Sequence, residues 1–177
     1  MKPTARIKNQ RGFTIAELLI VMTIILILAG LVIGGMSFVK NKQKNHQAEI
    51  QIKLLEKAIQ EYHSDNGEYP GDDDAGGSDG TGESNMLFRA LYYDGFQASD
   101  GSIPIYLSEL DPITDPQKWI NGTGAGATIT DPWGEEYRYR RGSGALNPDF
   151  DLWSSGPDLE TAGDGENSKD KDDIRNF

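Results

Sequence analysis

The chain has 177 residues, a formal net charge of −11 and no cysteine. Its length suits one domain of ordinary size. The absence of cysteine excludes disulfide bonds, thiolate metal sites and a cysteine nucleophile. A chain this acidic repels nucleic acid and attracts divalent cations, so nucleic-acid binding is not expected.

The first twelve residues are basic, and an uncharged apolar run follows them. Residues 1–12 contain two lysines and two arginines but no acid, so removing them from a charge of −11 leaves −15. Residues 18–36 carry no charge. A cleaved secretory signal has a shorter apolar stretch of about 7 to 15 residues, whereas about 20 apolar residues span a bilayer. We therefore predict a single membrane-spanning helix whose basic end stays in the cytoplasm.

Beyond the apolar run, the chain has the period of an amphipathic helix. Apolar side chains recur at steps of four and three residues: Ala48, Ile52, Leu55, Ile59 and Tyr62. This period predicts one buried stripe on a helix that extends from about Phe13 to about His63. Asn66-Gly67 followed by Pro70 should end it. The two histidines, His46 and His63, lie on this helix without a third ligand, so we expect neither metal binding nor catalysis there.

Residues 71–130 are less regular. An acidic low-complexity stretch at 71–85 is interpreted as a solvated loop, with a cation site at its aspartates as the alternative. Residues 86–96 (MLFRALYYDGF) predict a short helix with an aromatic face. Residues 111–130 are expected to form a loop with a turn at 122–126.

Two strands are predicted near the C-terminus. Residues 131–139 (DPWGEEYRY) indicate a turn followed by a strand with alternating side chains. Residues 149–158 (DFDLWSSGPD) indicate a second strand that ends in a tight turn. The two strands should pair antiparallel.

Several short sequence motifs, in this order, resemble those of the major pseudopilins of type II secretion systems, which belong to the type IV pilin-like superfamily. The motifs are RGFTIAE at 11–17, NGEYP at 66–70, DPWGEEY at 131–137, DLWSSGPD at 151–158 and DDI at 172–174. The resemblance covers about residues 11–70 and 131–174. Ile15 and Ala16 stand where the family has Leu and Ile, and the uncovered middle is longer than expected for a major pseudopilin.

The resemblance implies that a prepilin peptidase cleaves after Gly12 and that Phe13 becomes an N-methylated N-terminus. Glu17 is then a carboxylate at the start of a spanning helix, which is costly in a membrane and indicates function. Pairing with the N-terminus of a neighbouring subunit would satisfy both charges and fix the register of a filament. The alternative is that Glu17 lies in the headgroup zone, where the helix dipole favours it.

The family holds a calcium ion in its C-terminal loop, and the resemblance implies the same for this chain. The ligands carried over by matched position are three carboxylates and one backbone carbonyl: Asp158, Asp172, Asp173 and Ser155. Asp164 and Ser168 are further candidates. Calcium takes about six to eight oxygen ligands of these kinds. The alternative is a flexible acidic tail, because Asp, Gly, Ser and Lys are typical of disordered ends.

The expected fold is α+β, with a long N-terminal helix packed on a small antiparallel β-sheet and a long calcium-binding C-terminal loop. The expected segments are a leader at 1–12, a transmembrane and polymerisation helix at 13–36, an amphipathic helix half at 37–66 and a periplasmic head at 67–177.

The resemblance implies a structural subunit, not an enzyme. It would be anchored in the bacterial inner membrane and, after cleavage, would polymerise with itself into the periplasmic pseudopilus of a type II secretion system. Implied partners are the prepilin peptidase, minor pseudopilins and the inner-membrane assembly platform. The alternative is a type IV pilus subunit for adhesion, motility or DNA uptake. An anchored hydrolase using Ser154 or Ser155 would need a base within reach, and both histidines lie on the helix.

Overall fold

The structure is a computed structural model. The residues that it describes are 13–71, 83–98 and 100–177, except for the side chains of 32–38. The chain divides into two units, Met1–Lys40 and Asn41–Phe177, and helix α1 (Ile15–Asn66) contributes to both. The predicted helix is therefore confirmed, beginning two residues later and ending three residues further on. Most of the predicted acidic loop lies outside the described residues.

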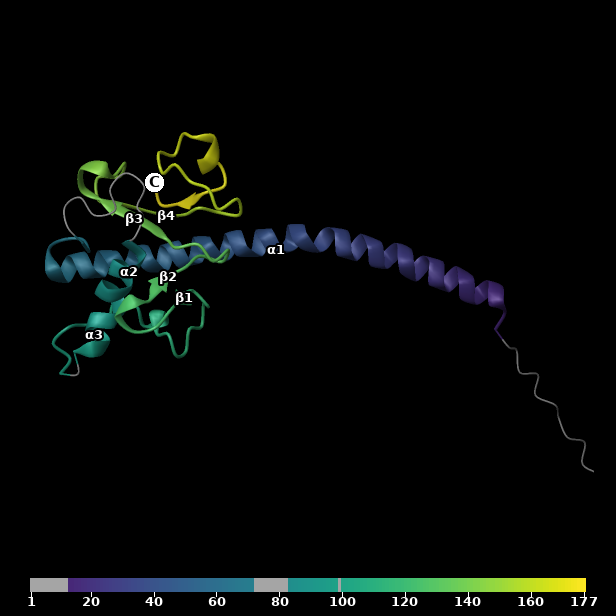
Figure 1. Ribbon diagram of the computed structural model, residues 1–177, viewed down its shortest axis with the longest axis horizontal. Helices are drawn as coiled ribbons and strands as arrows, with labels where there is room; N and C mark the ends of the chain where they lie inside the picture. The colour runs from purple at the N-terminus through teal and green to yellow at the C-terminus, as the bar shows by residue number, and fades with distance from the viewer. Residues whose placement is uncertain (1–12, 72–82, 99) are drawn as a thin grey trace, which may run out of the picture. The chain divides into compact units, whose positions relative to one another are not determined.

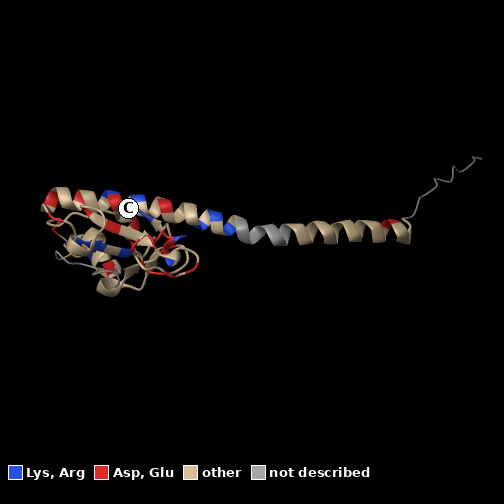
Figure 2. Cartoon of the chain, turned by 90° about the horizontal axis from the view of Figure 1, so that it is seen from above, with Lys and Arg blue, Asp and Glu red and all other residues tan. Residues whose placement is uncertain are grey.

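The described part of the N-terminal unit is an apolar helix with exposed side chains. Between Phe13 and Leu31 the only charged residue is Glu17, and Figure 2 shows a single red turn in this stretch. Within the part of the chain that is described, no helix meets the length and hydropathy required to cross a membrane. The end of the span predicted at 13–36 lies outside the described side chains.

In the C-terminal unit, one face of α1 lines the core. Ala48, Ile52, Leu55 and Ile59 are buried, as their period predicted, and Tyr62 is half-buried. Burial of each leucine or isoleucine side chain contributes about 1.5 to 3 kcal/mol relative to exposure. The amphipathic stripe therefore holds this section of α1 to the rest of the unit.

The predicted stop signals end α1 and join it to the sheet. Gly67 adopts φ +77°, a left-handed conformation that glycine adopts without a steric penalty. Beyond it, the Tyr139 hydroxyl donates to the Pro70 carbonyl at 3.1 Å, and Arg141 Nη1 donates to the Tyr69 carbonyl at 2.6 Å. These bonds hold the turn after α1 against a strand about 70 residues further along the chain.

Three consecutive helical segments follow. They are α2 (Glu83–Phe88), a π-helical turn (Arg89–Tyr93) and α3 (Asp94–Gln97). They confirm the helix predicted over 86–96. Short 3₁₀ turns occur at Ser108–Leu110, Gly124–Gly126, Gly142–Gly144 and Ser168–Asp170.

The strands form two antiparallel sheets. The first pairs β1 (Ile120–Asn121) with β2 (Thr128–Ile129), which corrects the loop predicted across 111–130. The predicted turn joins these two strands, and Gly122 and Gly124 both have positive φ there. The second sheet has the order β3-β4-β5, from β3 (Arg138–Arg141), β4 (Phe150–Ser154) and β5 (Ile174–Arg175).

Strands β3 and β4 pair antiparallel as predicted, with Arg138 opposite Trp153. The alternation predicted for the first of them is wrong, because Tyr139, Arg140 and Arg141 are all buried. Arg140 can be buried because its Nε lies 2.6 Å from a carboxylate oxygen of Asp151 on β4. Burial of both faces of β3 is therefore accompanied by an ion pair between Arg140 and Asp151.

Figure 1 shows β3 and β4 on one side of the 41–66 section of α1, and α3 and β1 on the other. The hydrophobic core of this unit contains side chains from α1, α2, the π-helical turn and the strands β2, β3 and β4. Its fully buried large side chains include Leu55, Ile59, Phe88, Leu91, Trp119, Ile129, Tyr137, Tyr139 and Trp153.

The predicted turn before β3 is organised by one buried carboxylate. Asp131 Oδ1 accepts hydrogen bonds from the amides of Trp133, Gly134 and Glu135 at 2.9, 2.9 and 3.0 Å. Its Oδ2 accepts one from the Ser154 hydroxyl at 2.5 Å. Burial raises the pKa of Asp131, although these hydrogen bonds act to lower it. The turn is thereby fastened to the end of β4.

Candidate functional site

The first candidate site is the start of α1. Thr14 and Glu17 form a reciprocal capping box: Glu17 Oε2 accepts from the Thr14 amide at 2.8 Å, and Thr14 Oγ1 accepts from the Glu17 amide at 3.2 Å. Each bond satisfies an amide that the first helical turn would otherwise leave without a partner. Phe13 directly precedes this cap and is exposed. Gly12, the predicted cleavage residue, lies outside the described residues.

The capping box gives Glu17 a local structural role that the sequence reasoning missed. Thr14 followed three residues later by Glu17 is the spacing that signals it. The amide and the hydroxyl of Thr14 both donate to the same carboxylate oxygen of Glu17, Oε2, at 2.8 and 2.9 Å. A carboxylate has about four acceptor positions, so Glu17 can cap its own helix and still pair with a cation.

The second candidate site is the loop between β4 and β5, which holds all the residues predicted to bind calcium. Strand pairing places Ser154 opposite Ile174, so Ser155 and Asp173 lie at the two ends of the loop. Gly156 has φ +68°, and a Cβ there would overlap the Asp172 carbonyl. This close approach requires glycine and brings the two ends of the loop together.

The predicted ligands at the loop ends interact directly. The Asp158 amide donates to Asp172 Oδ2 at 3.1 Å. Thr161 Oγ1 lies 2.7 Å from Asp173 Oδ2, while Asp173 Oδ1 and Ser155 Oγ are buried without a hydrogen-bond partner.

The surroundings of the Asp173 carboxylate disfavour its negative charge. Burial raises its pKa to about 6, and repulsion from Asp170 and Asp172 adds to the effect, while Thr161 and Arg175 oppose it. A buried carboxylate oxygen without a donor, close to other carboxylates, fits a cation ligand. Among the residues that the structure describes, no group of three or more His, Asp or Glu is close enough to hold a metal ion.

Asp170 organises the loop and was not among the predicted residues. Its Oδ1 accepts from the Ala162 amide at 2.5 Å, and its Oδ2 accepts from the Gly165 amide at 2.8 Å. Burial acts to raise the pKa of Asp170, but the Ala162 amide, Asp164 and the other loop amides outweigh it and lower the pKa to about 2. Asp170 is therefore ionised at neutral pH and folds the loop around itself.

Arg140 ties this loop to the sheet. Its Nη2 donates to the Gly163 carbonyl at 2.6 Å, in addition to the ion pair of its Nε with Asp151. The guanidinium also lies 5.0 Å from the centre of the Trp153 ring and 5.7 Å from that of Phe177. One buried cation thus joins the sheet, the loop and the end of the chain.

Two family models match the chain. The prokaryotic N-terminal methylation motif matches residues 7–33, and the model of type II secretion system (T2SS), protein G, matches residues 106–176. The first match contains the start of α1, and the second contains the β-sheets and the C-terminal loop.

Several curated proteins are similar to the chain. It is 28% identical to the type II secretion system core protein G of Escherichia coli (strain K12) over 176 residues, which cover 96% of this chain and 92% of that protein. The protein of the same name from Vibrio cholerae is 26% identical, covering 90% of this chain and 89% of its own length. The one from Klebsiella michiganensis is 38% identical over 65 residues, which cover 37% of this chain and 46% of that protein. No solved structure matches the chain significantly.

Proposed function

Since the chain belongs to the family of the type II secretion system protein G, we propose that its mature form polymerises through its N-terminal helix into the periplasmic pseudopilus of that system. The observation that carries this proposal is Glu17, the one charge between Phe13 and Leu31, at the capped start of α1. A carboxylate in apolar surroundings requires a counter-charge. The N-terminal amine of a neighbouring subunit supplies that charge and fixes the axial register.

The proposal includes the maturation and location of the subunit. A prepilin peptidase cleaves after Gly12, and Phe13 becomes an N-methylated N-terminus. The subunit is anchored in the inner membrane, with its N-terminus cytoplasmic and its head periplasmic, before it joins the fibre. Its further partners are minor pseudopilins and the inner-membrane assembly platform. The role is structural and requires no catalysis. A type IV pilus subunit is not favoured, because the family model and the relatives carry the name of protein G.

Mass spectrometry of the N-terminus tests this proposal. The full chain is expressed with and without a prepilin peptidase. We expect a mature chain that starts at N-methylated Phe13 only when the peptidase is present. An intact leader in both samples, or cleavage near Gly34 or Gly35, would show that the chain is an ordinary anchored or secreted protein.

We also propose that the C-terminal loop binds a structural calcium ion. Asp158, Asp172 and Asp173 would supply carboxylate oxygens, and Ser155 its backbone carbonyl, as calcium prefers. The buried Asp173 Oδ1 without a donor supports this ligand set. The ion would compensate the repulsion among the loop carboxylates and close the loop without a disulfide bond.

Thermal unfolding tests the calcium proposal. An ion present at 100 times its dissociation constant stabilises the folded state by about 2.7 kcal/mol. We expect calcium to raise the Tm of the wild-type chain well above its value in chelator, and Asp173→Asn to abolish most of this increase. Glu166→Gln, which removes an exposed carboxylate from the same loop, should respond as the wild type does. If calcium leaves the wild-type Tm unchanged, the loop has no calcium site.

A further inference from the structure

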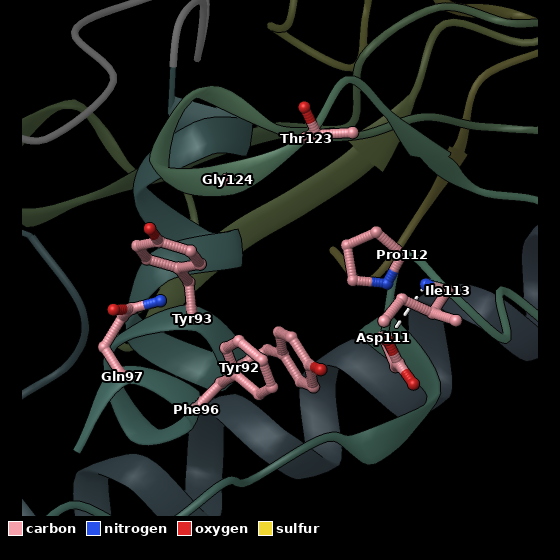
Figure 3. A pocket seen from close by; sticks show the side chains of 9 residues that line it. All are labelled: Tyr92, Tyr93, Phe96, Gln97, Asp111, Pro112, Ile113, Thr123 and Gly124. Atoms are coloured by element: carbon pink, nitrogen blue, oxygen red, sulfur yellow. Dashed lines mark hydrogen bonds between the residues drawn. The ribbon is translucent and has the colours of Figure 1, made fainter. Parts of the chain in front are cut away.

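A cavity of about 270 Å³ lies in the C-terminal unit, and no residue of either candidate site lines it. Figure 3 shows the rings of Tyr92 and Phe96 side by side at one edge, Tyr93 at a second, and Pro112 and Ile113 opposite. The Tyr92 and Phe96 rings are stacked, with centroids 5.7 Å apart and planes inclined by 13°. Most of this wall is therefore aromatic or aliphatic.

The cavity is open to a partner. The residues Phe96 and Ile113 at its edge are 54% and 87% exposed. Gly124 lines the rim close to Tyr93: a Cβ there would lie 4.0 Å from the Tyr93 hydroxyl. Ligand pockets for drug-sized molecules are about 300 to 1,000 Å³, so this cavity suits a single side chain better than a large cofactor.

The carboxylate of Asp111 also lines this cavity. Asp111 Oδ1 accepts from the Ile113 amide at 2.9 Å, and its Oδ2 accepts from the Thr114 hydroxyl at 3.2 Å. The Ile113 amide lowers the pKa of Asp111, with smaller contributions from Thr114 and Tyr92 against the opposing effect of burial. The carboxylate is therefore ionised at neutral pH, and the loop holds it in place.

The charges around the cavity favour a cation. None of the nine described residues that line it is Lys or Arg, and the chain as a whole carries −11. Aromatic faces attract cations by about 0.5 to 2 kcal/mol, and a guanidinium both stacks on such faces and pairs with a carboxylate. An anion or a second carboxylate would be repelled by Asp111.

We propose that this cavity is a docking site for the side chain of an arginine presented by a partner polypeptide. The guanidinium stacks against the rings of Tyr92 and Phe96 and pairs with the Asp111 carboxylate. The aliphatic stem of the arginine lies against Pro112 and Ile113. This role does not rest on the pseudopilin assignment, since it uses only the residues of the cavity.

The test uses the full chain in a lipid nanodisc with isotope-labelled isoleucine methyl groups, observed by NMR. The probe is N-acetyl-arginine methylamide, and N-acetyl-citrulline methylamide is its uncharged control of the same shape. We expect the arginine probe to shift the Ile113 methyl signal in a saturable way and the citrulline probe to bind about tenfold more weakly.

Variants separate the parts of the proposed site. Asp111→Asn keeps an oxygen for the Ile113 amide but removes the charge, and Phe96→Leu removes one ring; each should weaken arginine binding about tenfold. Glu68→Gln, which removes an exposed carboxylate outside the cavity, should leave binding unchanged. Equal binding of both probes, no saturable shift, or a saturable shift with the neutral sugar cellobiose in place of the arginine probe would overturn the proposal.

Discussion

At the scale of single residues, Glu17 combines a helix cap and a charge, and a substitution can separate them. Glutamine at the third helical position still accepts a hydrogen bond from the capping residue, so Glu17→Gln should keep the start of α1 and the membrane insertion of the chain. The lost charge should impair pairing with a neighbouring subunit. We expect normal amounts of the variant in the membrane fraction but few sedimentable filaments.

The matched control for that experiment is Thr14→Ala, which removes the hydroxyl of the capping box and keeps the Glu17 charge. Loss of an N-cap costs about 0.5 to 2 kcal/mol, so filaments should persist at reduced stability. Normal filaments from Glu17→Gln would contradict the charge-pairing role. Equal loss in both variants would assign Glu17 to the helix cap alone.

Asp131 predicts a specific dependence of stability on pH. Burial raises its pKa above the ordinary 3.8, so the native state binds this proton more tightly than the unfolded state. Its contribution to the free energy of unfolding is therefore fully present below pH 3.8 and is lost as pH rises through the higher native pKa. Asp131→Asn removes the titration but keeps an oxygen for the turn amides.

Thermal melts of the wild type and Asp131→Asn, taken from pH 3.8 to neutral pH in chelator, check this dependence. We expect the wild type to lose stability relative to the variant as pH rises. Ser154→Ala removes a hydrogen bond that lowers the Asp131 pKa. This variant should therefore lose stability at a higher pH than the wild type does. A difference between wild type and Asp131→Asn that is constant across the range would contradict the assignment.

At the scale of secondary structure elements, the sequence predicts what repeats along the chain and misses what depends on distant partners. The stripe of Ala48 and Leu55 follows from a local period. Gln51 is as deeply buried as they are, because Tyr137, 86 residues away, donates to its side-chain oxygen at 2.8 Å. No local pattern contains that partner.

The C-terminal loop shows the same limit. Its predicted ligands came from motifs matched to the family. Asp170, in contrast, organises the loop because amides of residues 162–165 fold back and donate to it. Strand β5 has two residues, too few for a recognisable alternation, and it exists because β4 offers a free edge for pairing. Contacts between segments that are apart in the sequence therefore determine both the role of Asp170 and the existence of β5.

The link between sheet and loop predicts a large loss of stability when Arg140 is removed. Arg140→Met leaves Asp151 buried without its counter-charge and leaves the Gly163 carbonyl without its donor. Breaking a buried ion pair in this way costs about 3 to 5 kcal/mol. Chemical denaturation should measure that loss, and limited proteolysis should show cleavage within residues 155–173.

Arg89→Met is the matched control, because Arg89 pairs with Asp94 near the surface, at 3.4 Å, with side chains that are 51% and 40% exposed. Exposed ion pairs contribute about 0 to 1 kcal/mol. Similar losses in the two arginine variants would mean that the pairing of Arg140 with Asp151 and the loop does not determine stability.

At the scale of the whole molecule, the division into two units predicts which part of the chain folds alone. Among the residues that the structure describes, every buried hydrophobic residue lies between Ala48 and Trp153, inside the unit Asn41–Phe177. A fragment with these bounds should unfold cooperatively, with the Tm and the calcium response of the full chain. It should not enter membranes, because it lacks the apolar run at 18–36, and it should not form filaments, because it lacks Phe13 and Glu17.

A shorter fragment that begins at Lys53 is the control for this prediction. It lacks the buried side chains of Ala48, Gln51 and Ile52, and losing a buried aliphatic side chain of the size of isoleucine costs about 2 to 5 kcal/mol. Its free energy of unfolding should fall by at least that amount, whereas the fragment from Asn41 should match the full chain. If the longer fragment also lacked a cooperative transition, folding of the C-terminal unit would depend on residues before Asn41, and the division between polymerising helix and independent head would be wrong.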